Sequence, residues 1–222
     1  MKSLNSAWKE TAILPFFLVF FIVILFFILP FSDGNKFIQR LITVFLAINM
    51  VIGVISINSN KTIKNISILI AFLVTTIEII SIETDSSPFR IFAMASWICF
   101  FCCLLYIFLI KVFESKINNI HRIQGGIACY LLLGIIFSFV HSLIFFNNNE
   151  AYNLVVSPIQ NNLVSYQFIY YSYTTLTTTG FGDISPLTPI AQAASNLEGI
   201  IGVLFPTVLL GYLISDSTSQ KR

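Results

Sequence analysis

The residues best suited to chemistry in this sequence lie in the segment 178–183, which reads Thr-Thr-Gly-Phe-Gly-Asp. A cation that leaves water needs a ring of oxygens, and several copies of one strand can supply that ring from backbone carbonyls. A strand that turns successive carbonyls to one side must alternate the sign of its φ angles. Gly180 and Gly182 reach positive φ without steric cost. Thr178 adds a hydroxyl oxygen below the carbonyls, and Phe181 is expected to pack outward. The segment therefore predicts a cation-binding strand that works as one of several copies.

With its flanking aromatic run and polar turn, this segment resembles the signature of potassium channels, usually written T-V-G-Y-G-D. The resemblance covers roughly residues 124–215 and implies a selectivity filter that ends at Gly182. It implies that K+ is bound by four backbone carbonyls and one hydroxyl, those of Thr178, Thr179, Gly180 and Phe181, with the Thr178 hydroxyl. The sequence departs from the signature at Thr179, where the family has Val, and at Phe181, where it has Tyr. Family members with Phe exist, whereas Thr179 adds a hydroxyl behind the filter.

The resemblance also assigns residues that support the filter. Tyr170 and Tyr171 match an aromatic cuff whose phenols reach backbone or filter groups. Some relatives have a glutamate at the position of Thr174 that hydrogen-bonds the external aspartate, here Asp183, and this chain lacks that pair. The segment 165–177 is too short to span a membrane, and we expect a re-entrant pore helix whose carbonyl end favours a cation.

Composition predicts an all-α integral membrane protein. The chain has 222 residues, of which 56% are hydrophobic and 10% charged, whereas soluble domains carry about 25% charged residues. The net charge of +2 argues against nucleic-acid binding. No constellation of catalytic side chains or metal ligands appears, so the sequence predicts neither an enzyme nor a cofactor other than permeant K+.

Six apolar stretches approach the roughly 20 residues that cross a bilayer: 11–31, 38–57, 63–82, 89–110, 125–146 and 190–214. If the N-terminus is cytoplasmic, nine Lys and Arg residues fall on the cytoplasmic side and three, Lys36, Arg40 and Arg90, on the other. This bias also places the filter mouth outside. The sequence therefore predicts a multi-pass plasma membrane protein, of the bacterial inner membrane, with both termini in the cytoplasm.

We expect four parts along the chain. Residues 1–110 would form a peripheral four-helix domain, in the position of a voltage sensor. Its last helix has no basic residue between 91 and 110, so the steep gating that several moving charges provide is not expected. Residues 111–123 would form an amphipathic interfacial linker helix, a plain connector or a mechanical coupler, which Gly125-Gly126 then breaks. Residues 124–216 would be the pore domain and 217–222 a cytosolic tail.

The last apolar helix contains two residues that suit a gating hinge. Gly202 lies 20 positions after Gly182, as the hinge glycine does in two-helix relatives. The alternative is that Gly202 only admits close helix packing. Pro206 lacks one backbone hydrogen bond and is expected to kink the helix.

Two acidic residues and a histidine fall within apolar helices. Glu198 is expected behind or below the filter, either bracing the pore helix through the hydroxyls of Thr174, Thr175 or Thr177, or adding charge to the cavity. Glu78 is expected near the wet outer end of its helix. His141 is expected at the outer boundary as an interfacial residue, with a pH sensor as the alternative.

The sequence as a whole predicts a potassium-selective channel in which three further copies of the chain complete the pore within lipid. A non-selective monovalent cation channel stays open because Thr179 departs from the signature. An accessory subunit of a potassium-uptake system is the other alternative. Uptake proteins of the Trk or Ktr type carry four pore repeats in one chain, whereas this chain has one.

Overall fold

The computed structural model describes residues 19–23, 36–57, 61–84, 87–113, 119–154 and 166–219. The elements are α3 (Lys36–Ile57), α4 (Lys61–Thr84), α5 (Ser87–Val112), α6 (Asn119–Asn147), β1 (Tyr152–Asn153), α7 (Tyr166–Leu176), β2 (Ser185–Pro186) and α8 (Pro189–Ser219). Of the first predicted span, 11–31, only the helical residues 19–23 are described.

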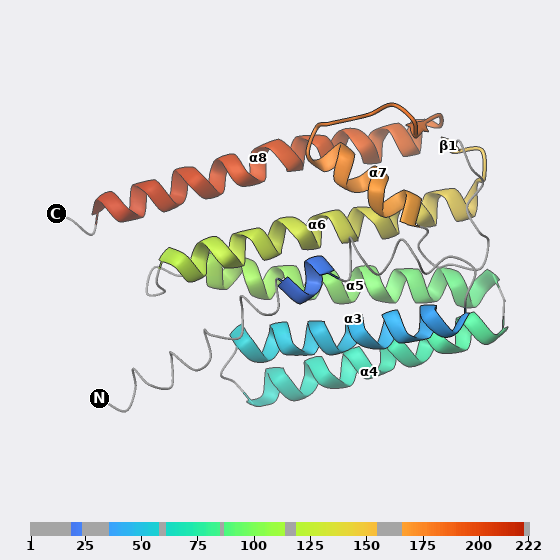
Figure 1. Cartoon of the computed structure of the whole chain (residues 1–222), viewed down its shortest axis with the longest axis horizontal. Helices are drawn as coiled ribbons and strands as arrows, with labels where there is room; N and C mark the ends of the chain where they lie inside the picture. Colours follow the sequence, from blue (N-terminus) through green and yellow to red (C-terminus); the bar gives the residue numbers. More distant parts are fainter. Residues whose placement is uncertain are drawn as a thin grey trace.

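The long helices lie side by side in layers (Figure 1). α5 packs on α3 and α4 on one side and on α6 on the other, and α8 packs on α6 from the far side. The short helix α7 is held between α6 and α8. The part of the chain with the filter segment is therefore positioned by α6 and α8.

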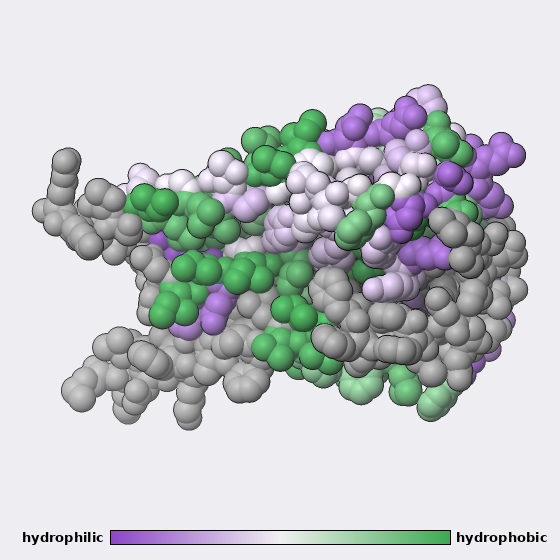
Figure 2. Space-filling view, turned by 45° about the horizontal axis from the view of Figure 1, so that its top comes forward, coloured by the Kyte–Doolittle hydropathy of each residue, from purple (hydrophilic) through white to green (hydrophobic). Residues whose placement is uncertain are grey.

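Three helices among the described residues are long and apolar enough to cross a membrane: 88–110, 120–147 and 189–215. A shorter apolar stretch lies at 68–81 in α4. Hydrophilic side chains gather at the end of the molecule that carries β1 and the loop after α7, and hydrophobic ones lie along the helices (Figure 2). The chain is thus a helical membrane protein, and the count of six spans stays a prediction.

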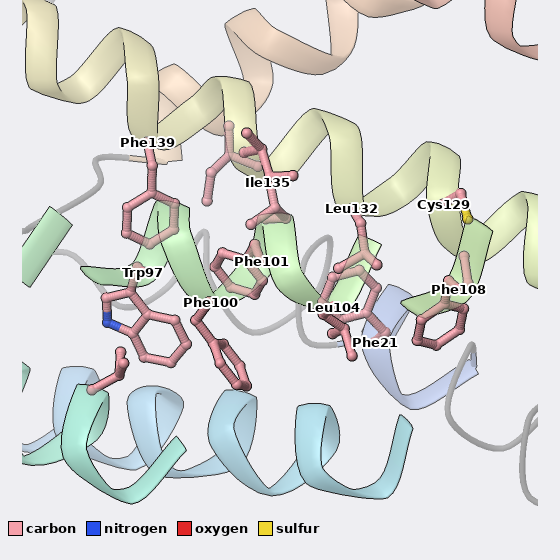
Figure 3. Packing of buried hydrophobic residues seen from close by; sticks show 14 of the residues in the cluster. Phe21, Trp97, Phe100, Phe101, Leu104, Phe108, Cys129, Leu132, Ile135 and Phe139 are labelled. Atoms are coloured by element: carbon pink, nitrogen blue, oxygen red, sulfur yellow. The ribbon is translucent and has the colours of Figure 1, made fainter. Parts of the chain in front are cut away.

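An aromatic row on α5 fixes that helix against α6. The Trp97 ring stacks on Phe101 with centroids 5.2 Å apart and on Phe139 of α6 at 6.2 Å. Figure 3 shows these rings between the α6 ribbon and the pair α3 and α4. Burial of large aromatic side chains is the main contribution that such a contact makes to stability.

Glu78 of α4 also lies in this packing, with partners on two other helices that were not expected for it. The side chain is half-buried, and its two oxygens accept hydrogen bonds from Thr43 Oγ1 of α3 at 3.0 Å and from Trp97 Nε1 of α5 at 2.5 Å. Glu78 therefore joins three helices of the peripheral domain.

The predicted helix break at Gly125-Gly126 is wrong. α6 runs from Asn119 to Asn147 without interruption, so the linker expected over 111–123 is divided between the end of α5, the start of α6 and residues 114–118, which lie outside the described part. A Cβ on Gly125 would lie 2.7 Å from Val112 Cγ2, and one on Gly126 would lie 2.2 Å from Leu209 Cδ2. Both glycines thus permit close packing onto neighbouring elements.

Candidate functional site

Two carbonyls at the end of α7 hold the segment that follows it. The Thr178 amide donates to the Thr175 carbonyl at 2.9 Å. The amides of Thr179 and Gly180 both donate to the Thr174 carbonyl, at 2.8 and 3.1 Å. These carbonyls have no amide partner within the helix because α7 ends there, and the chain that follows satisfies them.

The direction of these three amides fixes the direction of three carbonyls. In a trans peptide the N–H and the C=O of one plane point in opposite directions, and no described peptide bond is cis. Since the amides of 178, 179 and 180 point toward α7, the carbonyls of Thr177, Thr178 and Thr179 point away from it. Three successive carbonyls on one side form a row of oxygens that suits a dehydrated cation.

The backbone angles have the alternation that this row requires. Gly180 has φ of +52° and Gly182 has φ of +81°, which confirms the expectation for both glycines. Thr178 also lies at positive φ, at +58°, whereas Thr179 and Phe181 do not. The positive φ of Thr178 was not predicted, because a β-branched residue rarely adopts the left-handed region.

Two threonine hydroxyls, those of Thr177 and Thr179, are hydrogen-bonded to each other at the start of the segment. Thr177 Oγ1 donates to the Tyr173 carbonyl at 2.7 Å, so it is left to accept from Thr179 Oγ1, which lies 2.9 Å away. Thr179 is thereby held by its amide and by its side chain. The hydroxyl that distinguishes this filter from the signature therefore has a partner on the last turn of α7.

The expected aromatic support is divided between two directions. Tyr170 stacks on Phe181 with centroids 6.1 Å apart and planes at 5°. Desolvation and then a hydrogen bond to the Asp183 carboxylate raise the pKa of the Tyr170 phenol, which therefore stays a donor at the mouth of the segment. Tyr171 is buried and its hydroxyl lies 2.7 Å from Ser195 Oγ of α8. Tyr170 thus contacts the segment that the resemblance implies it supports, whereas Tyr171 contacts α8 instead.

Glu198 lies at 0% exposure between α6, α7 and α8, but its partners differ from those expected. Its carboxylate lies 2.8 Å from His141 Nε2 and hydrogen-bonds Ser172 of α7. The hydroxyl of Thr174 turns instead to the Tyr171 carbonyl at 2.9 Å. The expected contact of Glu198 with the helix now seen as α7 is therefore confirmed, but its partner is Ser172 and not one of the threonines named above.

His141 is not interfacial, which corrects the expectation for this residue. Its side chain has 0% exposure, and Nδ1 lies 2.7 Å from the hydroxyl of Tyr152. Tyr152 belongs to β1, which pairs antiparallel with β2 directly after the filter segment. The histidine therefore connects the strand pair of β1 and β2 to Glu198 of α8.

Gly202 packs against the end of the pore helix. A Cβ at this position would lie 1.9 Å from the Leu176 carbonyl oxygen, so only glycine admits the contact. Gly202 therefore permits close packing, and its role as a hinge stays a prediction. Pro206 lies within the continuous helix α8 and has no amide for the Gly202 carbonyl four positions before it.

A buried arginine at the start of α6 contacts the end of α5 and the last turns of α8. Arg122, which lies within the predicted amphipathic linker 111–123, is only 1% exposed. Its Nε donates to the Val112 carbonyl at 2.9 Å and its guanidinium lies 4.9 Å from the centre of the Tyr212 ring. Tyr212 in turn donates to the Phe113 carbonyl at 2.8 Å. The end of α5, the start of α6 and the end of α8 therefore meet at one cation, an arrangement that the linear sequence does not signal.

Comparison with known families identifies the part of the chain that this site occupies. Residues 127–217, from α6 through α8, match the family model described as an ion channel. No curated protein and no solved structure matches the chain. The match covers 91 of the 222 residues, and with the carbonyl row it supports passive ion conduction through this part of a helical membrane protein.

Proposed function

We propose that the chain is a potassium-selective channel and that residues 178–182 are its selectivity filter. The observation that carries the proposal is the set of three amides bonded to α7, which turns the carbonyls of Thr177, Thr178 and Thr179 to one side. These carbonyls lie in a segment with the potassium-channel residues Gly180 and Gly182 at positive φ. K+ would bind to the carbonyls of Thr178, Thr179, Gly180 and Phe181.

Four copies of the chain would complete this pore. In one chain the filter segment is exposed, and Phe181 has an exposed fraction of 69%. α8 also exposes a series of large apolar residues: Leu197, Ile200, Val203, Leu204 and Val208. One strand is one wall of an ion path, so a closed ring of identical chains is the assembly that uses both exposed surfaces.

The remaining features follow from the sequence pattern. Six spans with cytoplasmic termini would put the filter mouth outside a plasma membrane. The fourth span, in α5, has no basic residue between 91 and 110, so the peripheral domain would pack in lipid without sensing voltage steeply. Gly202 and Pro206 would be the place at which α8 bends.

A flux assay tests the proposal. Purified protein in liposomes should pass K+ and Rb+ far better than Na+, and Ba2+ should block. Gly180→Ala should abolish flux because alanine at φ +52° is strained, although nothing lies within 4 Å of its Cβ. Gly199→Ala is the matched control, since Gly199 is equally open and lies within a helix.

The outcome also separates the alternatives. Equal Na+ and K+ flux through the unchanged chain would support the non-selective cation channel. A folded, assembled protein without flux would support an accessory subunit of an uptake system.

A further inference from the structure

A single line of hydrogen-bonding groups joins β1, α6, α7 and α8 in a dry interior. Tyr152 Oη lies 2.7 Å from His141 Nδ1, and His141 Nε2 lies 2.8 Å from one Glu198 oxygen. The other Glu198 oxygen contacts Ser172 Oγ, which lies 2.7 Å from the Gly134 carbonyl oxygen. These side chains are 0–4% exposed, so water does not supply missing partners.

The line contains four contacts between heavy atoms, which we call gaps. A gap is a hydrogen bond only if one of its two atoms carries a proton that points into it. If Glu198 is ionised and His141 neutral, the three side chains of Tyr152, His141 and Ser172 supply one proton each. The Gly134 carbonyl only accepts. Three protons leave one gap in which two lone pairs face each other across a hydrogen-bond distance, and this is unfavourable in a dry site.

A fourth proton on Glu198 fills every gap. The Glu198 acid group then donates to Ser172, which donates to Gly134, while His141 donates to Glu198 and Tyr152 donates to His141. A fourth proton on His141 does not have this effect. The imidazolium would donate from Nδ1 to the Tyr152 oxygen, so the tyrosine proton would point away from the line. Ser172 would still have a single proton for its two contacts, with Glu198 and with the Gly134 carbonyl.

Apart from His141, the ionisable groups around Glu198 are tyrosines, and they do not favour its ionised form. The Tyr171 ring lies 5.0 Å from the His141 ring, and its hydroxyl is bonded to Ser195. Tyr130 and Tyr173 also lie within electrostatic range of Glu198. Burial, and then the nearby Tyr171 and Glu198, raise the pKa of the Tyr152 phenol, so Tyr152 keeps its proton. None of these tyrosines carries a positive charge.

We infer that Glu198 is a proton-binding site and that its proton holds the pore helix in the conducting position. Ser172 lies two residues before Thr174, whose carbonyl receives the Thr179 and Gly180 amides. Loss of the proton breaks one contact of Ser172, either to α8 or to α6, and so displaces the filter anchor. Conduction is therefore present at low pH and lost as pH rises through the titration of the site. This inference rests on the proposed channel function for its flux consequence only.

Infrared difference spectroscopy tests the proton site without relying on flux. The whole protein in lipid should show the C=O stretch of a protonated carboxylic acid that disappears as pH is raised from about 5 to about 9. Glu78 is a second carboxyl held between helices that can give the same band, so the spectra are compared in the Glu78→Gln background. Glu78→Gln should show the band, and Glu78→Gln combined with Glu198→Gln should lack it. A titrating band that survives in the double variant, or its absence from Glu78→Gln, would overturn the proton site.

Potassium flux at each pH tests the consequence. The unchanged chain and Glu78→Gln should lose about tenfold in flux over the same pH range. Glu198→Gln should be flat, because a neutral amide donates to Ser172 and accepts from His141 at every pH. A flat profile in the unchanged chain would overturn control of conduction by this proton. Absence of K+ flux at every pH, with the Glu198 band present, would refute the channel proposal and not the proton site.

Discussion

At the scale of single residues, the departure of the proposed filter from the potassium-channel signature is compensated locally. Thr179 stands where the signature has Val, and its hydroxyl is bonded to that of Thr177. Both threonines are exposed in one chain, and the proposed ring of four chains would exclude water from them. Leaving a hydroxyl unpaired in a dry site costs about 1–3 kcal/mol, whereas replacing both partners by apolar groups of the same shape is nearly neutral.

This asymmetry gives a prediction for the pair. Thr177→Val should lower the permeability ratio of K+ to Na+ by about fivefold, the effect of about 1 kcal/mol, because Thr179 loses its acceptor. Adding Thr179→Val to it should restore most of the ratio. Bi-ionic reversal potentials of the single and double variants measure this, with Thr179→Val alone as the control. Equal ratios in Thr177→Val and the unchanged chain would show that the hydroxyl pair has no role.

Glu198 gives a second prediction at this scale, for stability. Glu198→Val removes the acceptor of His141 and the partner of Ser172, so the free energy of unfolding should fall by about 2–5 kcal/mol. In Glu198→Gln, which keeps both contacts, the free energy of unfolding should fall by less than about 1 kcal/mol. Denaturant-induced loss of the assembled protein in detergent compares the two. Similar losses of unfolding free energy in both variants would mean that the hydrogen bonds of Glu198 do not contribute to stability.

At the scale of elements, the contact between α8 and the end of α7 determines how closely the helices approach. Gly202→Ala places a methyl group on the Leu176 carbonyl, which as backbone cannot rotate away. We expect a loss of at least about 3 kcal/mol in the free energy of unfolding. Gly199→Ala, one turn earlier and open, should be neutral or slightly stabilising. Thermal unfolding of both variants measures the difference, and equal melting temperatures would mean that α8 shifts freely along α7.

Features within one element could be predicted from the sequence, whereas contacts between elements could not. The filter angles at Gly180 and Gly182 follow from local residue types, and so does the long helix α8, whose first turn is capped by Thr188 with Pro189 following. The partners of Glu198 do not follow, because His141 is 57 and Ser172 26 positions away in the sequence. Gly125 and Gly126 were expected to end a helix because nothing in the linear sequence shows that Val112 and Leu209 lie against them.

At the scale of the whole molecule, α5 and the contacts of Arg122 connect the peripheral helices to residues 127–217, the part that matches the ion-channel family model. α5 contributes aromatic packing to α6 and no charge between 91 and 110. Moving one charge across the membrane yields about 2.3 kcal/mol per 100 mV, so a helix without charges supplies no such energy.

The corresponding prediction concerns voltage. Open probability in planar bilayers should change little across physiological voltages, with at most a shallow dependence from ions within the filter. Single-channel recording over a range of potentials measures it. A steep sigmoid equivalent to several gating charges would contradict the role of the peripheral domain given above.

The contact of Gly202 with Leu176 has a mechanical consequence. Pro206 leaves the Gly202 carbonyl without an amide partner in the part of α8 that contacts the Leu176 backbone. In the proposed channel, a bend of α8 at Pro206 would press on this contact or pull away from it. Because Leu176 directly precedes Thr177 and the carbonyl row, such a bend would be transmitted to the proposed filter. We therefore expect that a variant which changes the bending of α8 also changes the ion preference.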